Sequence, residues 1–328
     1  MTKSLILEKK IEEKQKILQE IFKEIHKKII GQEILIRDLF IWLLTWWHIL
    51  LEWVPWIAKT LTVDTLAKTL DLDFKRIQFT PDLLPSDLIW TEIYNNSKSI
   101  FETIKWPIFT NFLLADEINR APWKVQSALL EVMAEKQVTI WDKTYILDRP
   151  FIVLATQNPI EQSWTYRLPE AELDRFLLKT NVDYPSLNEE KDIIKNIYNI
   201  ESAEIKKIIS QNEVLELQNL VKEIYVSENI VNYIWDLVFA TRQASLYWLE
   251  DIEKYLNYWV SPRWSLALLK ASQALAFLEW RNFVLPEDVK KIAVSALAHR
   301  LVLNYDARAD EVTEIDIVNK ILSKVNIS

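Results

Sequence analysis

The chain has 328 residues, a formal net charge of −8, no cysteine, one glycine and 15 tryptophans. Its 50% hydrophobic content suffices for two domains with cores of their own and excludes a disordered or fibrous protein. The acidic balance argues against nucleic-acid binding, and the lack of cysteine excludes a disulfide framework. The N-terminus lacks the apolar core of a signal peptide, so we expect a cytoplasmic protein with no membrane insertion.

The first part of the chain alternates between helical and strand patterns. Helices are predicted over residues 6–29, 32–44, 60–70, 81–89, 122–136 and 168–176, and strands over 48–51, 74–79, 108–117, 151–156 and 177–182. Residues 138–147 are expected to form a hairpin, and 91–105 an insertion with weak strand character. His48 is expected to have a structural role. The alternation predicts an α/β domain over residues 1–185, with a parallel sheet and helices on both faces.

Beyond Pro185-Ser186 the pattern is helical throughout. The clearest helices are predicted over residues 214–225, 228–241, 262–278 and 286–300, so we expect a second, all-α domain over residues 186–328. Arg263 falls in the first turn of one of these helices, where a positive charge opposes the helix dipole. This position suggests that Arg263 meets a bound anion.

The stretch from Glu52 to Thr60 is almost a phosphate-binding loop. A strand leads into a turn that ends in Lys59 and Thr60, the lysine and hydroxyl that such a loop offers to the β/γ-phosphates and magnesium. The turn itself has Trp53 and Trp56 where small residues should let the backbone N–H groups approach the phosphates. Indole side chains at these positions would fill the phosphate nest.

The composition offers an explanation for these tryptophans. Average glycine usage of about 7% predicts roughly two dozen glycines in a chain of this length, whereas this one has a single glycine. Tryptophan also occupies positions typical of glycine elsewhere, such as Trp141 in the predicted hairpin turn and Trp280 after a predicted helix. We therefore predict that UGA encodes glycine in the source organism. The alternative is a truly tryptophan-rich chain with a blocked loop.

Polar residues follow three of the predicted strands. Asp116 and Glu117 end an apolar strand in a Walker B pattern, in which the first acid lies near the metal and the second orients the attacking water. Asn158 follows the strand over 151–156 and could hold that water. Arg175 precedes the last core strand and could serve a neighbouring subunit's phosphate, a role worth roughly 10³–10⁵ in rate. The alternatives are a helix cap for the acids, a turn at Asn158 before Pro159, and a surface ion pair for Arg175.

Several motifs in one order resemble the MoxR family of AAA+ ATPases over roughly residues 20–315. They are Glu52 to Thr60 with glycine at positions 53 and 56, Leu114 to Pro122, Ala155 to Gln162, Leu168 to Phe176, Val260 to Arg263 and His299 to Leu301. Ala58 departs from the usual second glycine of the loop but is similar to a common family variant. The resemblance implies a P-loop AAA+ domain followed by an all-α lid, with ATP and Mg²⁺ as ligands.

The resemblance also implies a role for each site residue. Magnesium would be held by Thr60 and Asp116, Glu117 would be the catalytic base, and Asn158 would be sensor 1. Arg175 would be the arginine finger and Arg263 the sensor of the lid. The remaining implied nucleotide contacts are Ile30 and Gly31 beside the adenine and, around the phosphates, Trp53, Val54, Pro55, Trp56, Ile57, Ala58 and Lys59.

Quaternary structure and partners are likewise implied by the resemblance. A member of this family is expected to form a hexameric ring, to remodel client proteins with ATP, and to work with a von Willebrand factor A-domain protein. Residues 91–105 would be a helix-2 insert and 138–150 a pre-sensor hairpin. Two other functions stay open: a catalytically inactive scaffold, if Trp53 and Trp56 are real, and a chelatase-type or nucleic-acid ring motor.

Overall fold

The computed structural model describes residues 3–53, 59–95, 100–105, 107–140, 142–158, 166, 168–182, 184–256 and 263–327. Five residues of the predicted phosphate-binding turn lie outside this set, namely Val54, Pro55, Trp56, Ile57 and Ala58, as does Trp141 of the predicted hairpin turn. Among the helices formed by the described residues, none is both long and apolar enough to cross a membrane.

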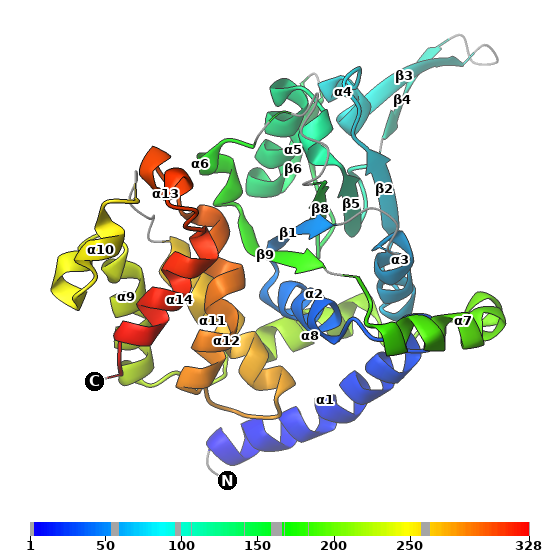
Figure 1. The fold of residues 1–328 in the computed structure, drawn as a ribbon. Coiled ribbons are helices and arrows are strands. Elements are labelled where there is room, and N and C mark those ends of the chain that lie inside the picture. The colour runs from blue at the N-terminus through cyan, green and yellow to red at the C-terminus, as the bar shows by residue number, and fades with distance from the viewer. Residues whose placement is uncertain are drawn as a thin grey trace.

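A five-stranded parallel sheet forms the centre of the molecule (Figure 1). Its strands lie in the order β2-β5-β8-β1-β9, with β1 His48–Trp53, β2 Phe74–Gln78, β5 Phe112–Asp116, β8 Ile152–Gln157 and β9 Phe176–Val182. Every neighbouring pair is parallel. The apolar runs of β5 and β8 are buried almost throughout, as expected for strands with both faces covered. The predicted strands are confirmed, although the one predicted from Ile108 begins only at Phe112.

Helices cover both faces of this sheet. They are α1 Lys3–Ile25, α2 Glu33–Thr45, α3 Lys59–Thr69, α4 Pro85–Ile89, α5 Trp123–Glu135 and α6 Glu170–Leu173. Successive side chains of a strand point to opposite faces. Accordingly, Ile49 and Leu51 pack into the hydrophobic cluster shared with α2 and α3, and Leu50 packs into the cluster shared with α5.

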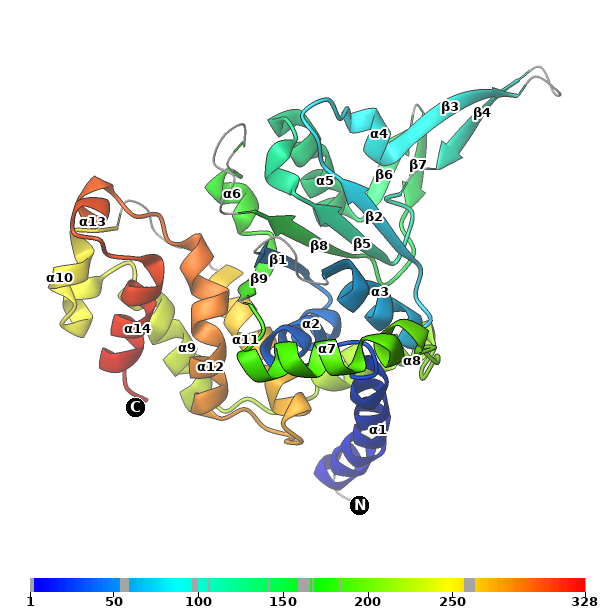
Figure 2. The ribbon, with the colours of Figure 1, turned by 45° about the vertical axis from the view of Figure 1, so that its right-hand side comes forward.

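Two antiparallel hairpins extend the α/β part. β3 Trp90–Asn95 pairs with β4 Ile100–Lys105, and β6 Gln137–Ile140 pairs with β7 Lys143–Ile146. The β3–β4 hairpin projects away from the body of the molecule at the far end from the helical part (Figure 2). The expected insertion and the expected hairpin are thus both present.

The C-terminal part is helical, as predicted. Its elements are α7 Leu187–Ser202, α8 Gln211–Val221, α9 Glu228–Ala240, α10 Glu250–Glu253, α11 Arg263–Leu278, α12 Pro286–Leu297, α13 Tyr305–Ala309 and α14 Glu314–Lys324, with the 3₁₀ turns η2 Ala244–Tyr247 and η3 Ala298–Arg300. Helices α7 and α14 were not among the predicted elements. Both begin with a capping box, Ser186 with Glu189 and Thr313 with Asp316, which was the signal available for them.

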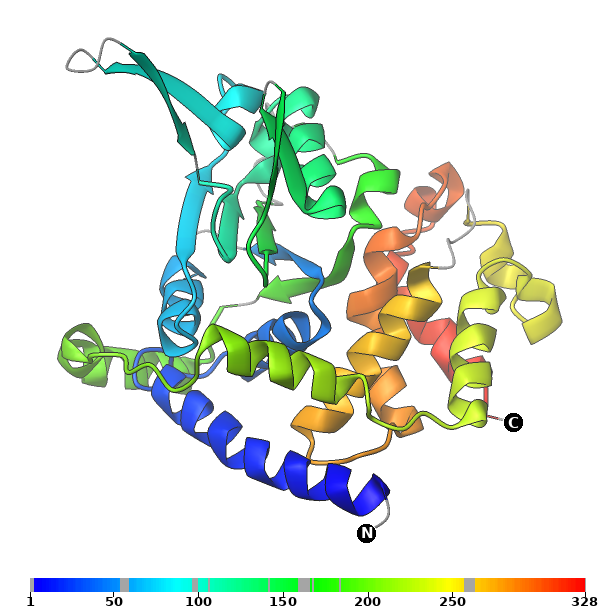
Figure 3. The same ribbon diagram turned by 180° about the vertical axis from the view of Figure 1, so that it is seen from behind.

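The helical part packs directly on α2 rather than standing apart (Figure 3). One buried cluster runs from α1 and α2 into α8, α9, α11, α12 and α14. Within it, the buried Gln218 of α8 donates a hydrogen bond to the carbonyl of Leu43 at 2.7 Å. The protein is therefore an α/β domain with a parallel sheet, followed by an all-α domain that shares its core. A division between residues 185 and 186 stays a prediction.

His48 has the structural role that was expected of it. Its Nδ1 accepts a hydrogen bond from the backbone N–H of Val153 at 3.0 Å, and its Nε2 donates to the carbonyl of Met133 at 3.2 Å. Burial lowers the pKa of His48 to about 3. The neutral ring therefore joins the start of β1 to β8 and α5.

Candidate functional site

The carboxyl ends of β1, β5 and β8 lie together at one edge of the sheet, named here the carboxyl edge. In the register of the strands, Ala155 lies beside both Ala115 and Leu50, so the residues that follow them are also neighbours. Thr156 joins the two acids of β5 at this edge. Its hydroxyl donates to Asp116 Oδ1 at 2.6 Å and accepts from the backbone N–H of Glu117 at 2.9 Å.

Two side chains of β2 complete this network. Arg76 donates from Nε and Nη2 to Asp116 Oδ2 at 3.1 and 2.6 Å, and Gln78 donates to Glu117 Oε2 at 2.7 Å. Arg76 Nη2 also donates to Gln78 Oε1 at 2.8 Å. Neither Arg76 nor Gln78 was predicted from the sequence as a site residue. The signal was their spacing of two on a strand, which places them on one face, but their relevance depends on β2 pairing with β5.

The two acids have different surroundings. Asp116 is buried, with a relative exposure of 1%, whereas Glu117 is half-buried and has an ion pair with Arg120 at 3.2 Å. Glu117 has a left-handed backbone with φ of 56°, an uncommon conformation that turns the chain out of the strand. It precedes η1 Ile118–Arg120 but makes no side-chain capping hydrogen bond there. The alternative of a helix cap is therefore wrong for Glu117.

Asn158, Lys59 and Thr60, also predicted for the phosphate site, lie at the same edge. Asn158 follows the last residue of β8 and is buried. Lys59 and Thr60 are the first two residues of α3, the helix that follows β1 across the predicted turn. A helix N-terminus offers free backbone N–H groups and a positive dipole end, which favour phosphate. The structure thus places Lys59, Thr60, Asp116, Glu117 and Asn158 at the ends of adjacent elements.

A cavity of about 510 Å³ lies beside the start of α3. Its lining is mainly apolar and comes from the residues before α2, from α3 and from the region of α7: Lys28, Ile29, Ile30, Gln32, Leu61, Thr62, Tyr184, Pro185, Glu190, Ile193, Ile194, Ile197 and Ile200. Ile30, predicted to border an adenine, is one of these residues. The neighbouring Gly31 has φ of +68°, and a Cβ there would collide with Glu189. The size and apolar lining suit a flat organic ring.

Arg175 and Arg263 lie at the opposite edge of the sheet, named here the amino edge. The register pairs His48 with Phe176 and Trp53 with Val182, so Arg175 precedes β9 where β1 begins. The length of β1, about 17 Å at about 3.3 Å per residue, separates Arg175 from the carboxyl edge. Arg175 donates to the carbonyl of Leu130, and Arg263 pairs with Asp174 at 3.3 Å. In Figure 1, α6 and α3 accordingly lie on opposite sides of the sheet.

The carboxylate of Asp174 lies where a bound anion was expected, beside Arg263. Arg263 is the first residue of α11, as predicted, and the carboxylate of Asp174 lies against it. An acid near a helix N-terminus is favourable against the dipole. The structure therefore supplies an internal anion for Arg263.

The residues at the carboxyl edge suit magnesium. Mg²⁺ prefers oxygen donors and is commonly held by one or two carboxylates together with substrate phosphates. Thr60 offers a hydroxyl and Asp116 a carboxylate that Thr156 already orients through a hydrogen bond. These two side chains would hold Mg²⁺ if it binds with a nucleotide.

Known proteins resemble this chain over most of its length. Residues 48–178 match the family model described as "ATPase family associated with various cellular activities (AAA)", and residues 250–321 match the model described as "AAA lid domain". The chain is 45% identical over 302 residues to Chaperone MoxR1 of Mycobacterium tuberculosis, which covers 92% of this chain and 80% of that protein. It is 44% identical over 283 residues to YeaC of Bacillus subtilis, an uncharacterized protein, with 85% of each covered.

A solved structure supports the same relationship. A crystal structure from Cytophaga hutchinsonii, provisionally described as an ATPase, has a TM-score of 0.93 against this chain at 50% sequence identity. The match covers 98% of both chains.

Proposed function

Because this chain belongs to the MoxR family of AAA+ ATPases, we propose that it hydrolyses ATP and uses the energy to remodel client proteins. The observation that carries the proposal is the hydrogen-bonded set of Thr156, Asp116, Glu117 and Gln78 at the carboxyl edge, beside the start of α3. The remodelling role is drawn from the relative named a chaperone.

Each residue of the carboxyl edge has a role in this proposal. Lys59 binds the β/γ-phosphates, and Thr60 and Asp116 hold Mg²⁺, which when bound neutralises the charge that develops on the phosphates. Glu117 orients the attacking water and accepts its proton. Gln78 holds Glu117 in place through the bond to Oε2, and Asn158 orients the water from β8. The cavity at Ile30 takes the adenine.

The amino edge acts on a different nucleotide. Arg175 and Arg263 lie on the far side of the sheet from their own phosphate turn, so we assign both to the site of the neighbouring subunit. A hexameric ring would supply every site with these two arginines. A von Willebrand factor A-domain protein remains the expected partner, and the cytoplasm the expected location.

We further propose that the tryptophans at glycine-type positions are glycine in the native protein. Trp46, Trp248 and Trp280 have φ values of 53°, 60° and 70°, a conformation that glycine adopts freely and bulky residues rarely. In the described part of the chain, the buried indole N–H groups of Trp42 and Trp46 have no hydrogen-bond partner. A buried indole normally finds one. Glycine at positions 53 and 56 would remove the two indoles from the phosphate nest and leave its backbone N–H groups accessible.

Two measurements test the proposed function. Peptide mass spectrometry on the native protein over residues 51–59 should find glycine at positions 53 and 56. The protein with its native residues should then hydrolyse ATP in a Mg²⁺-dependent manner, with a specific activity that rises with protein concentration as rings assemble. Tryptophan at both positions, with no stabilisation by ATP, would instead support the inactive scaffold.

A further inference from the structure

The amino edge holds a cluster of charged residues that joins the lid to the α/β part. Asp174, two residues before β9, pairs with Arg263 of α11 at 3.3 Å and with Arg300 of η3 at 3.4 Å. We name these three residues the Asp174 cluster. Its lid members lie 89 and 126 positions along the chain from Asp174. The cluster therefore links two distant segments at one carboxylate.

Arg300 is held tightly in this place. Its side chain has a relative exposure of 1%, and it donates to the carbonyl of Ala296 at 2.9 Å and to that of Phe176 at 2.5 Å. Burial lowers the pKa of Arg300 to about 10, against the opposing effect of Asp174. A guanidinium still bears its charge at neutral pH under these conditions, and a buried charge must be paired. Asp174 supplies the pairing charge.

The pairing of β1 with β9 is irregular at the start of β9, and a backbone carbonyl there accepts hydrogen bonds from the lid. The register of β1 against β9 shifts by one residue between His48 and Ile49. Such a bulge disrupts the ladder hydrogen bonds locally. The carbonyl of Phe176 accepts from Arg300, and also from Nε2 of the buried His299 at 3.4 Å. The residues His299 and Arg300, a motif with no role in the proposed site, thus bind the first residue of β9.

Arg175 lies between the two attachment points of the lid. Asp174 precedes it, and Phe176 follows it, so both of its neighbours in the chain are bound by lid residues. Its own guanidinium donates to the carbonyl of Leu130 in α5. The residues on either side of Arg175 are therefore bound by the lid, while the carbonyl of Arg175 accepts from Trp47 and its side chain donates to Leu130, both in the α/β part.

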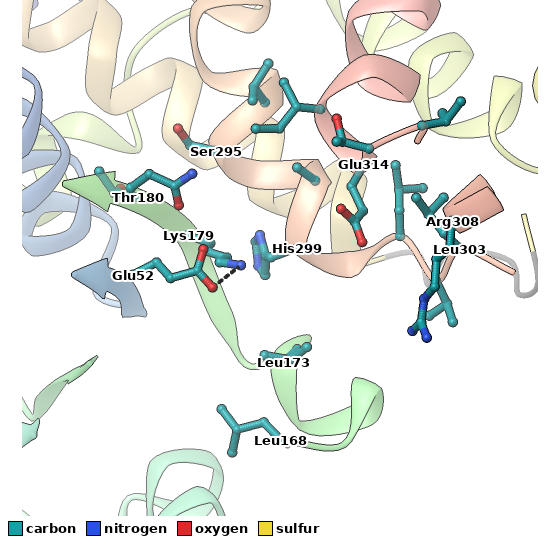
Figure 4. Close-up of a pocket in the computed structure, with 18 of the residues that line it drawn as sticks. Glu52, Leu168, Leu173, Lys179, Thr180, Ser295, His299, Leu303, Arg308 and Glu314 are labelled. Carbon is teal, nitrogen blue, oxygen red and sulfur yellow. Dashed lines mark ion pairs between the residues drawn. The ribbon is translucent and has the colours of Figure 1, made fainter. Parts of the chain in front are cut away.

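Beside this cluster, a cavity of about 680 Å³ lies between the lid and the α/β part (Figure 4). Leu168, Leu173 and Lys179 line it from one side, and Ser295 and His299 line it from the lid. Lys179 pairs there with Glu52 at 2.9 Å, one residue before Trp53. The two parts are not closely packed around this cavity, and beside it the polar contacts at Asp174 and Phe176 join them, in addition to the core that they share around α2.

We propose that Asp174 is a positioning residue that fastens the lid, through Arg300 and Arg263, to the segment bearing Arg175, so that lid movement carries Arg175 toward or away from the neighbouring subunit. This assignment rests on the proposed function, because it gives Arg175 a nucleotide to act on. It adds a mechanical role for the lid, which would act on the next site around the ring rather than on its own.

A double-mutant cycle with Arg175 tests the assignment. Asp174→Asn, Arg175→Ala and the double variant are compared with wild type, all with the residues that the native chain has at positions 53 and 56. We expect Asp174→Asn to lower kcat by up to about 100-fold, as a displaced catalytic group does, without changing ATP affinity. The double variant should be no slower than Arg175→Ala alone. A merely structural role would slow hydrolysis in both backgrounds.

Two further variants serve as controls, one for unfolding and one for a general disruption of the lid. Asp174→Asn together with Arg300→Met removes both charges of the pair, a replacement that folds tolerate better than one unpaired buried charge. It should remain folded and be as slow as Asp174→Asn. Glu279→Gln breaks the exposed pair of Glu279 with Lys291, at 3.0 Å within the lid, and should leave kcat unchanged.

Hydrogen exchange supplies a readout that does not depend on activity. In Asp174→Asn, backbone amides of residues 175–177 and 298–301 should exchange faster, while those of α3 should not. Unchanged exchange, wild-type kcat in Asp174→Asn, or an added loss of kcat in the double variant would each overturn the assignment. A wild-type protein that hydrolyses no ATP would contradict the proposed function instead, and with it any effect of Asp174 on catalysis.

Discussion

The two edges of the central sheet differ in charge and in the way their residues are held. At the carboxyl edge, the acids Asp116 and Glu117 are bound by side chains of β2 and β8. At the amino edge, arginines are bound by backbone carbonyls and by Asp174. The length of β1, about 17 Å, lies between them. In the proposed function, each subunit therefore contributes two half-sites, and a complete site requires two subunits.

The largest expected effect concerns positions 53 and 56 at the carboxyl edge. A chain with tryptophan at both should show no ATP binding, because the indoles would fill the phosphate nest. Glycine at both positions should restore binding, measured with a fluorescent ATP analogue. Trp123→Gly, at an exposed position at the start of α5, is the control and should not restore it. Equal binding by both chains would refute the blocked loop.

The next effect separates hydrolysis from binding at the same edge. Glu117→Gln should lower kcat by about 10²–10⁴, the usual contribution of a general base, because the amide cannot accept the proton of water. ATP affinity should stay within twofold of the wild-type value, about 0.4 kcal/mol. The exposed Glu131 of α5 provides the matched change, Glu131→Gln, which should leave kcat unaltered.

Acid should lower the free energy of unfolding, because His48 and His299 are buried at the amino edge. The pKa of His48 is about 3 in the folded protein and 6.5 ordinarily. Above pH 6.5 the imidazole of His48 is neutral in both the folded and the unfolded protein, so it does not change the free energy of unfolding. Between pH 6.5 and about 3 only the unfolded protein binds a proton at His48, so the free energy of unfolding falls as the pH is lowered. At pH 5 this loss is about 2 kcal/mol. Urea unfolding should show this loss of stability at pH 5 in the wild type and in His26→Gln. The loss should be smaller in His48→Gln.

The smallest expected effect is on stability at the carboxyl edge. Arg76→Ala should lower the free energy of unfolding by about 1 kcal/mol, since it leaves the buried Asp116 without two charged hydrogen bonds. The loss is limited because the Arg76 side chain is 45% exposed and its pair is partly screened by water. Lys75→Ala, an exposed neighbour on β2, should change stability less. Equal losses would show that Arg76 does not support Asp116.

Much of the carboxyl edge could be predicted from sequence because it depends on local order. A strand that ends in Asp116 and Glu117, and another that ends before Asn158, place their polar residues at one edge whenever the strands are parallel. Arg76 and Gln78 could not be assigned in this way, since their role depends on which strand lies beside β5. The contact of Asp174 with Arg300 spans 126 positions and has no local signal. Arg263 was expected to meet a bound anion as the sensor of the lid, and the tertiary structure puts it beside Asp174.

Mixed rings test the shared site most directly. Glu117→Gln retains the amino edge and loses the acid, whereas Arg175→Ala retains the acid and loses the arginine, so each variant alone should hydrolyse ATP very slowly. When the two are coexpressed and purified together through different tags, some interfaces combine an intact Glu117 with an intact Arg175. We expect hydrolysis in these mixed rings to rise well above that of either variant. Activity no higher than that of the separate variants would contradict a site divided between the two edges of neighbouring subunits.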